Sequence, residues 1–126
     1  MAGVKDFTEL IAWQLANELH ARAIELSRRP DVAGHRRYRS RLTDAAASPP
    51  HHIAEGFGRY RHHEFAQQVR IAKASEHELL TLFNEARRRG FLSATEVQEY
   101  EFLARRAITA ATGLIHYLEN RRDRWS

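Results

Sequence analysis

The chain has 126 residues, a net charge of +4 and no cysteine. This length suits one domain with a buried core, and the absence of thiols excludes a disulfide framework and a cysteine-ligated metal site. Charges interrupt every apolar stretch and the first residues form no signal peptide, so we expect a cytoplasmic protein with no membrane partner.

The basic residues are unevenly placed, and eighteen of the twenty are arginine. Residues 28–63 carry eight arginines against three acidic residues, whereas residues 1–27 and 64–86 are both net negative. Arginine binds phosphate and carboxylate groups with a planar fork that lysine lacks. A GC-rich genome would produce the same bias, so the composition alone does not decide between selection for anion binding and genome composition.

The first predicted helix runs from residue 7 or 8 to residue 27, with Thr8 as its N-cap. Two apolar stripes follow its helical spacing, although a helix on the surface of one bundle needs only one. We therefore expect part of this helix to contact another subunit. The candidate interface residues are Leu10, Ile11, Trp13, Leu15 and Leu19.

A second helix is predicted to begin near His35 and to meet two prolines, Pro49 and Pro50. Prolines have no N–H, so two hydrogen bonds to the carbonyls four residues earlier are lost. The helix therefore either bends there, or ends and restarts with Pro49 in its first position. Gly56 and Gly58 are expected to end it in the left-handed conformation.

The third helix is predicted over residues 62–89, with Glu76 among its inward positions and Gly90 at its end. The fourth begins at a capping box formed by Ser93 and Glu96 and reaches about residue 120. Short loops join these helices. The chain is thus predicted to be all-α: an antiparallel up-down-up-down four-helix bundle with a Pro-kinked second helix, one domain over residues 1–126 with a frayed tail at 121–126.

Four stretches carry a resemblance to a known family: Phe7–Gln14, Ser48–Arg59, Glu64–Leu79 and Gly90–Ser93. The most specific reads Ser-Pro-Pro-His-His-Ile-Ala-Glu-Gly-Phe-Gly-Arg and is similar to the family motif Ser-Ile-Pro-Ala-Asn-Ile-Ala-Glu-Gly-Phe-Gly-Arg. The chain resembles the small bacterial four-helix bundle proteins that include the 23S rRNA-intervening sequence proteins. The accessory variability determinant protein of diversity-generating retroelements is similar.

The resemblance implies a homopentameric barrel of bundles and no known enzymatic activity, with relatives associated with rRNA insertions or nucleic-acid binding. Pro49 stands where the family has Ile, His52 where it has Asn, and Ala74 where Gly is common. The role of the family Asn is therefore in doubt here. The candidate structural residues of the motif are Pro49, Pro50, Glu55, Gly56 and Gly58.

Eight histidines invite a metal hypothesis, but none has a glutamate three residues before it, as a di-iron bundle requires. Glu55 beside His51 or His52 could form an acid–base pair, yet no nucleophile or oxyanion donor accompanies it. We expect Glu55 to make a capping or interhelical hydrogen bond instead. The sequence therefore predicts no metal, no cofactor and no catalytic residue.

The strongest candidate site is basic. Arginines surround the start of the second helix, with Tyr38 among them, and two more lie at its other end. Basic residues with interleaved aromatics suit phosphate contact and base stacking. The candidate nucleic-acid-binding residues are Arg36, Arg37, Arg39, Arg41, Arg59 and Arg61.

Two alternative roles for these arginines stay open: a solvated face paired with acidic side chains, and docking to an acidic protein partner. We expect a non-enzymatic homo-oligomer of the 23S rRNA-intervening sequence type, with RNA or DNA as the candidate ligand. The alternative is a protein–protein interaction adaptor or scaffold that binds no nucleic acid.

Overall fold

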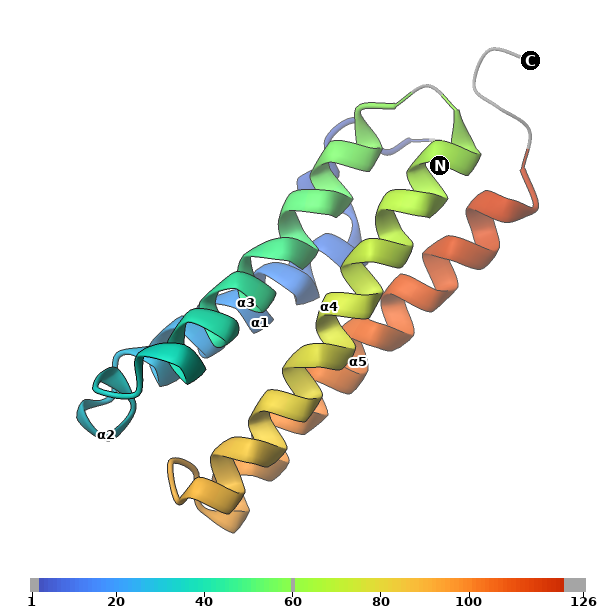
Figure 1. The fold of residues 1–126 in the computed structure, drawn as a ribbon. Coiled ribbons are helices and arrows are strands. Elements are labelled where there is room, and N and C mark those ends of the chain that lie inside the picture. Colours follow the sequence, from blue (N-terminus) through green and yellow to red (C-terminus); the bar gives the residue numbers. More distant parts are fainter. Residues whose placement is uncertain (1–2, 60, 122–126) are drawn as a thin grey trace.

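The computed structural model describes residues 3–59 and 61–121 (Figure 1). All secondary-structure elements in that part are helices, so the predicted all-α class is confirmed. The elements are η1 (Phe7–Glu9), α1 (Ile11–Ser27), α2 (Pro30–Ala33), α3 (Arg36–Phe57), α4 (His62–Arg89) and α5 (Ala94–Glu119).

The four long helices lie side by side as a helical bundle (Figure 1). α1 packs against α3 and α5, and α4 packs against the same two helices. Each long helix therefore has two neighbours, and their inward stripes enclose the core. Figure 1 shows α2 and the α4–α5 loop at one end, and the α3–α4 connection at the other.

The start of the first helix differs from the prediction. Thr8 is not an N-cap, because a 3₁₀ turn, η1, comes first and Leu10 is extended, with φ −77° and ψ 128°. The Glu9 carboxylate accepts a hydrogen bond from the Asp6 backbone N–H at 2.8 Å, and this contact fixes the short turn. The α-helix therefore begins only at Ile11.

α3 is one continuous helix that contains Pro49 and Pro50, so the alternative of an end and restart at Pro49 is wrong. Contacts with α4 on both sides of the prolines hold the helix together. Ser75 Oγ donates to Ser48 Oγ at 2.7 Å, and His52 Nδ1 lies 2.8 Å from Gln68 Oε1. A bend at the prolines stays a prediction.

The left-handed ending predicted for α3 is also wrong. Gly58 caps the helix in the right-handed region, with φ −74° and ψ −7°, and Gly56 lies inside the helix. Gly56 instead permits close packing, because a Cβ there would lie 2.6 Å from Phe65 Cδ1 and 2.9 Å from Gln68 Cβ. The glycine thus serves the contact between α3 and α4.

The turn between α4 and α5 follows the prediction. Gly90 ends α4 with φ +81°, the left-handed conformation that favours glycine. At the start of α5, the Glu96 N–H donates to Ser93 Oγ at 3.1 Å and the Ser93 N–H donates to Glu96 Oε1 at 3.0 Å. An ion pair with Arg29 and the bond from the Ser93 N–H lower the pKa of Glu96 to about 2.

Candidate nucleic-acid interface

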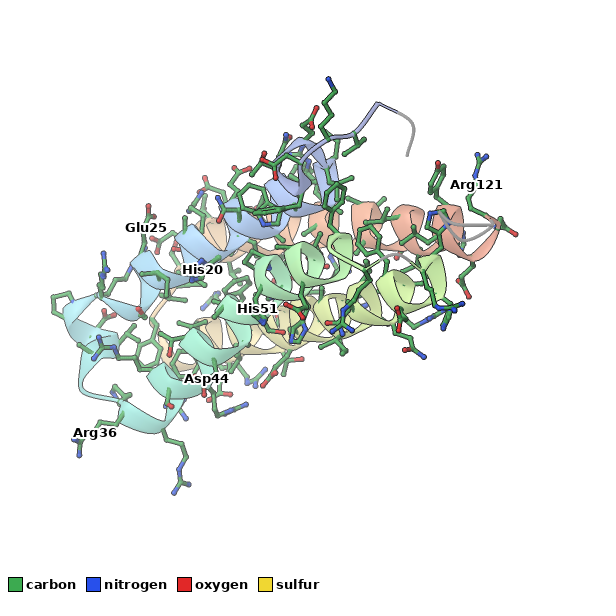
Figure 2. The ribbon with its side chains drawn as sticks, turned by 90° about the horizontal axis from the view of Figure 1, so that it is seen from above. His20, Glu25, Arg36, Asp44, His51 and Arg121 are labelled. Atoms are coloured by element: carbon green, nitrogen blue, oxygen red, sulfur yellow. The ribbon has the colours of Figure 1, made fainter. Side chains whose placement is uncertain are left out.

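The first turns of α3 present four exposed arginines, Arg36, Arg37, Arg39 and Arg41. Figure 2 shows the side chain of Arg36 extending away from the end of the bundle. Arg36 and Arg39 share one helix face, three residues apart, and line a shallow depression of about 270 Å³ together with Ser40 and Thr43. This part of α3 therefore offers guanidinium groups to an anionic partner.

Tyr38 does not join this surface. Only 1% of its side chain is exposed, and its hydroxyl donates to the Leu82 carbonyl at 2.6 Å. Burial raises the pKa of Tyr38, so the hydroxyl stays protonated as a donor. The expectation that Tyr38 stacks on a base is wrong, because the residue shares the inward stripe of α3 with Leu42.

Arg59 and Arg61 follow the opposite end of α3. The rise of an α-helix places Phe57, the last residue of α3, about 32 Å from Arg36, and Arg59 follows two residues later. Arg59 Nη2 lies 3.1 Å from the Glu55 carboxylate, one turn earlier, so this arginine is part of a local ion pair. Tyr60, between them, lies outside the described residues. Within one chain the six candidate arginines therefore do not form one surface.

Three further arginines, which were not assigned to the site from the sequence, lie beside the α3 cluster. Arg87, Arg88 and Arg89 are exposed in the last turn of α4. The guanidinium carbon of Arg89 lies 5.3 Å from the centre of the Tyr38 ring, which places this turn against the start of α3. The expected opposite directions of consecutive helices could have identified them.

We call these seven residues the basic end: Arg36, Arg37, Arg39, Arg41, Arg87, Arg88 and Arg89. Glu85 is its acidic neighbour, with one carboxylate oxygen 3.4 Å from Arg41 Nη1 and the other 2.8 Å from Arg89 Nη2. One carboxylate thus partly compensates two guanidinium groups. The basic end keeps an excess of positive charge.

The candidate interface residues of the first helix divide into covered and exposed ones. Leu19 is completely buried in its own bundle, and Leu10 and Leu15 are each 8% exposed. Trp13 is half-buried, with its ring edge-on to Phe7. Ile11, in contrast, is 62% exposed and presents apolar surface outside its own bundle.

A groove between α1 and α5 extends the surface around Ile11. It has a volume of about 510 Å³, and Leu15, Phe102 and Ala110 line it together with Ile11. Phe102 is 64% exposed. Phe102 was not predicted from the sequence, although a phenylalanine outside the inward stripe of its helix is a signal for such a surface.

The histidines and Glu55 of the central motif bond to different partners. Glu55 pairs with Arg59, while His52 contacts Gln68 on α4, and the His51 and His52 rings lie 5.0 Å apart. His52, which replaces the family Asn, thus links α3 to α4. Over residues 3–59 and 61–121, no three His, Asp or Glu side chains gather as metal ligands.

In the part that the structure describes, these features define a small helical-bundle protein with a basic end and an apolar groove between α1 and α5. The sequence model of the family described as 23S rRNA-intervening sequence protein matches residues 8–112, and the chain belongs to that family. No curated protein matches the chain. In the described part of the chain, no helix is long and apolar enough to cross a bilayer.

Proposed function

We propose that this protein is a non-enzymatic, homo-oligomeric, antiparallel four-helix bundle that binds RNA or DNA through its basic end. The observation that carries the proposal is the meeting of seven exposed arginines from α3 and α4 at one end of the bundle. Guanidinium groups make charge-assisted, often bidentate hydrogen bonds to phosphate oxygens. With Tyr38 buried, the surface supports backbone contacts, which carry no sequence information.

Self-association is proposed through the α1–α5 groove. Ile11 and Phe102 place two large, exposed apolar side chains on one face, and such a patch marks an interaction site. A second copy of the chain is the proposed occupant, and the family resemblance implies five copies. A closed ring would repeat the basic end in each subunit, so that weak phosphate contacts add through avidity.

The test compares two variants that each remove two positive charges. Arg36→Gln/Arg39→Gln alters the basic end, whereas Lys5→Gln/Arg121→Gln alters exposed cations elsewhere. Fluorescence anisotropy with single-stranded RNA and duplex DNA should show binding about tenfold weaker in the first variant and nearly unchanged in the second. Equal weakening in both would mean that net charge, and not the basic end, governs binding.

A further inference from the structure

A second cationic site lies between α4 and α5, away from the basic end. It is a groove of about 300 Å³ lined by Arg70, Lys73 and His77 from α4 and by His116 and Glu119 from α5. The helix rise places Arg70 about 26 Å from Arg87 along α4. The groove and the basic end are therefore separate surfaces.

Each wall of this groove is formed by residues on one face of a helix. Arg70, Lys73 and His77 are three and four residues apart, so they follow one face of α4, and His116 and Glu119 do the same on α5. Arg70 Nη2 lies 2.5 Å from a Glu119 oxygen, and this ion pair joins the walls at one end of the groove. The remaining cation, Lys73, is half-buried.

The groove contains more hydrogen-bond donors than its one carboxylate can occupy. A guanidinium, an ammonium and two imidazoles converge on it, and all four can donate. The Thr112 hydroxyl, which also lines the groove, donates to the Ile108 carbonyl at 2.8 Å and is already used. Within residues 3–59 and 61–121, the wall side chains thus leave donors without an internal acceptor.

An acid close to Lys73 does not neutralise this charge. Glu76, three residues after Lys73, is completely buried, and burial raises its pKa to about 8. Its carboxyl group is therefore protonated at neutral pH. Two permanent cations in the groove then face one anion, Glu119.

We propose that this α4–α5 groove binds a phosphoryl group, held by Arg70, Lys73, His77 and His116. A phosphoryl group offers three or more acceptor oxygens and up to two charges, which suits four converging donors better than the two oxygens of a carboxylate. The site does not depend on nucleic-acid binding at the basic end. Its ligand is either a free phosphorylated compound or a phosphate of a nucleic-acid backbone.

The first test uses pyrophosphate as the probe in isothermal titration calorimetry at low salt. Lys73→Gln and Arg70→Gln should each weaken binding about tenfold, because each removes a charge-assisted hydrogen bond. The control is Lys5→Gln, which removes the same charge from the other lysine of the chain and should leave the affinity unchanged. Lys73→Gln keeps the Arg70–Glu119 ion pair, so a loose α4–α5 contact cannot explain its effect.

A second readout reports on the site itself. Limited acylation of amines, followed by mass spectrometry, should label Lys73 several-fold less when pyrophosphate is present, while Lys5 is labelled equally with and without it. The proposal is overturned if wild type binds no pyrophosphate up to about 10 mM, or if Lys5→Gln weakens binding as much as Lys73→Gln.

A single-stranded RNA without terminal phosphates distinguishes the two sources. If Lys73→Gln also weakens RNA binding, the groove takes backbone phosphates; if RNA binding is unchanged, it takes a free phosphorylated compound. Both results support the site. Weaker RNA binding in Arg36→Gln/Arg39→Gln with unchanged pyrophosphate binding would show that the two surfaces act independently, so failure of one proposal leaves the other standing.

Discussion

At the scale of single residues, Glu76 is a carboxyl group inside the core. It is fully buried on α4, and neither carboxylate oxygen has a hydrogen-bond partner in the part of the chain that the structure describes. Burial raises its pKa from 4.5 to about 8, while the opposing charge of Lys73 is the smaller influence. The folded protein therefore holds a proton on Glu76 that the unfolded chain releases at neutral pH.

The raised pKa makes folding depend on pH. Below pH 4.5 Glu76 is protonated in both the folded and the unfolded state, so its titration does not change the free energy of unfolding. Stability then falls as the pH rises from 4.5 to about 8. Glu76→Gln removes this titration, so it should unfold with a free energy about 3 kcal/mol larger than wild type at pH 7. The free energies of unfolding of wild type and Glu76→Gln should converge near pH 4.5.

Urea denaturation at a series of pH values measures this difference. Glu78→Gln is the matched control, because it makes the same change at an exposed position two residues away and should leave the curve unchanged. A wild-type protein as stable as Glu76→Gln throughout pH 5 to 8 would contradict the account of Glu76.

At the scale of elements, α3 depends on its close approach to α4 at Gly56. The space for a Cβ is taken by Phe65, whose ring lies in the packed interface. Gly56→Ala should destabilise the fold by about 1–3 kcal/mol, because the helices must separate or Phe65 must leave its position. Thermal unfolding followed by circular dichroism measures the loss.

Gly113→Ala provides the comparison for this variant. Gly113 lies in α5, is exposed, and has no heavy atom within 4 Å of the position that a Cβ would take. Alanine should stabilise that helix by about 0.5–1 kcal/mol. If Gly56→Ala proved as harmless as Gly113→Ala, the packing role of Gly56 would be refuted.

The sequence predicted those elements whose limits are set locally. Gly90 and the Ser93–Glu96 capping box define the ends of α4 and α5 through contacts within a few residues. The start of α1 is also set locally, by the Asp6–Glu9 capping box that the sequence prediction missed, whereas the continuity of α3 depends on tertiary contacts, which periodicity does not show. α3 continues through two prolines because α4 supports it on both sides.

The candidate site was predictable in part. Charge counting identified the arginines of residues 28–63, but it could not show that Arg89 lies over the Tyr38 ring, because that contact depends on how α3 and α4 pack. The protonation of Glu76 was likewise hidden, since periodicity places the residue inside but says nothing of its hydrogen-bond partners.

At the scale of the whole molecule, assembly should depend on the α1–α5 groove. Ile11→Glu replaces one of the two large exposed apolar side chains of this surface and should convert the proposed oligomer to monomers, since the apolar contact is lost and a carboxylate must leave water. Ile71→Glu is the control, because Ile71 is also exposed, at 44%, but lies on α4. Light scattering coupled to gel filtration measures both.

Two results would show that the α1–α5 groove is not the subunit interface. If wild type were a monomer at micromolar concentration, or if Ile71→Glu dissociated the oligomer and Ile11→Glu did not, the groove would not be the subunit interface. The repeated basic ends would then have to act without avidity.

The central claim is that the basic end binds nucleic-acid backbone. The most direct measurement is fluorescence anisotropy of the verified oligomer with single-stranded RNA and duplex DNA across a salt series. Log affinity should fall linearly with log salt, and neutralising Arg36, Arg37, Arg39 and Arg41 together should flatten the slope and weaken binding to all sequences alike. Absence of binding at low salt would contradict the claim and favour a protein-interaction adaptor.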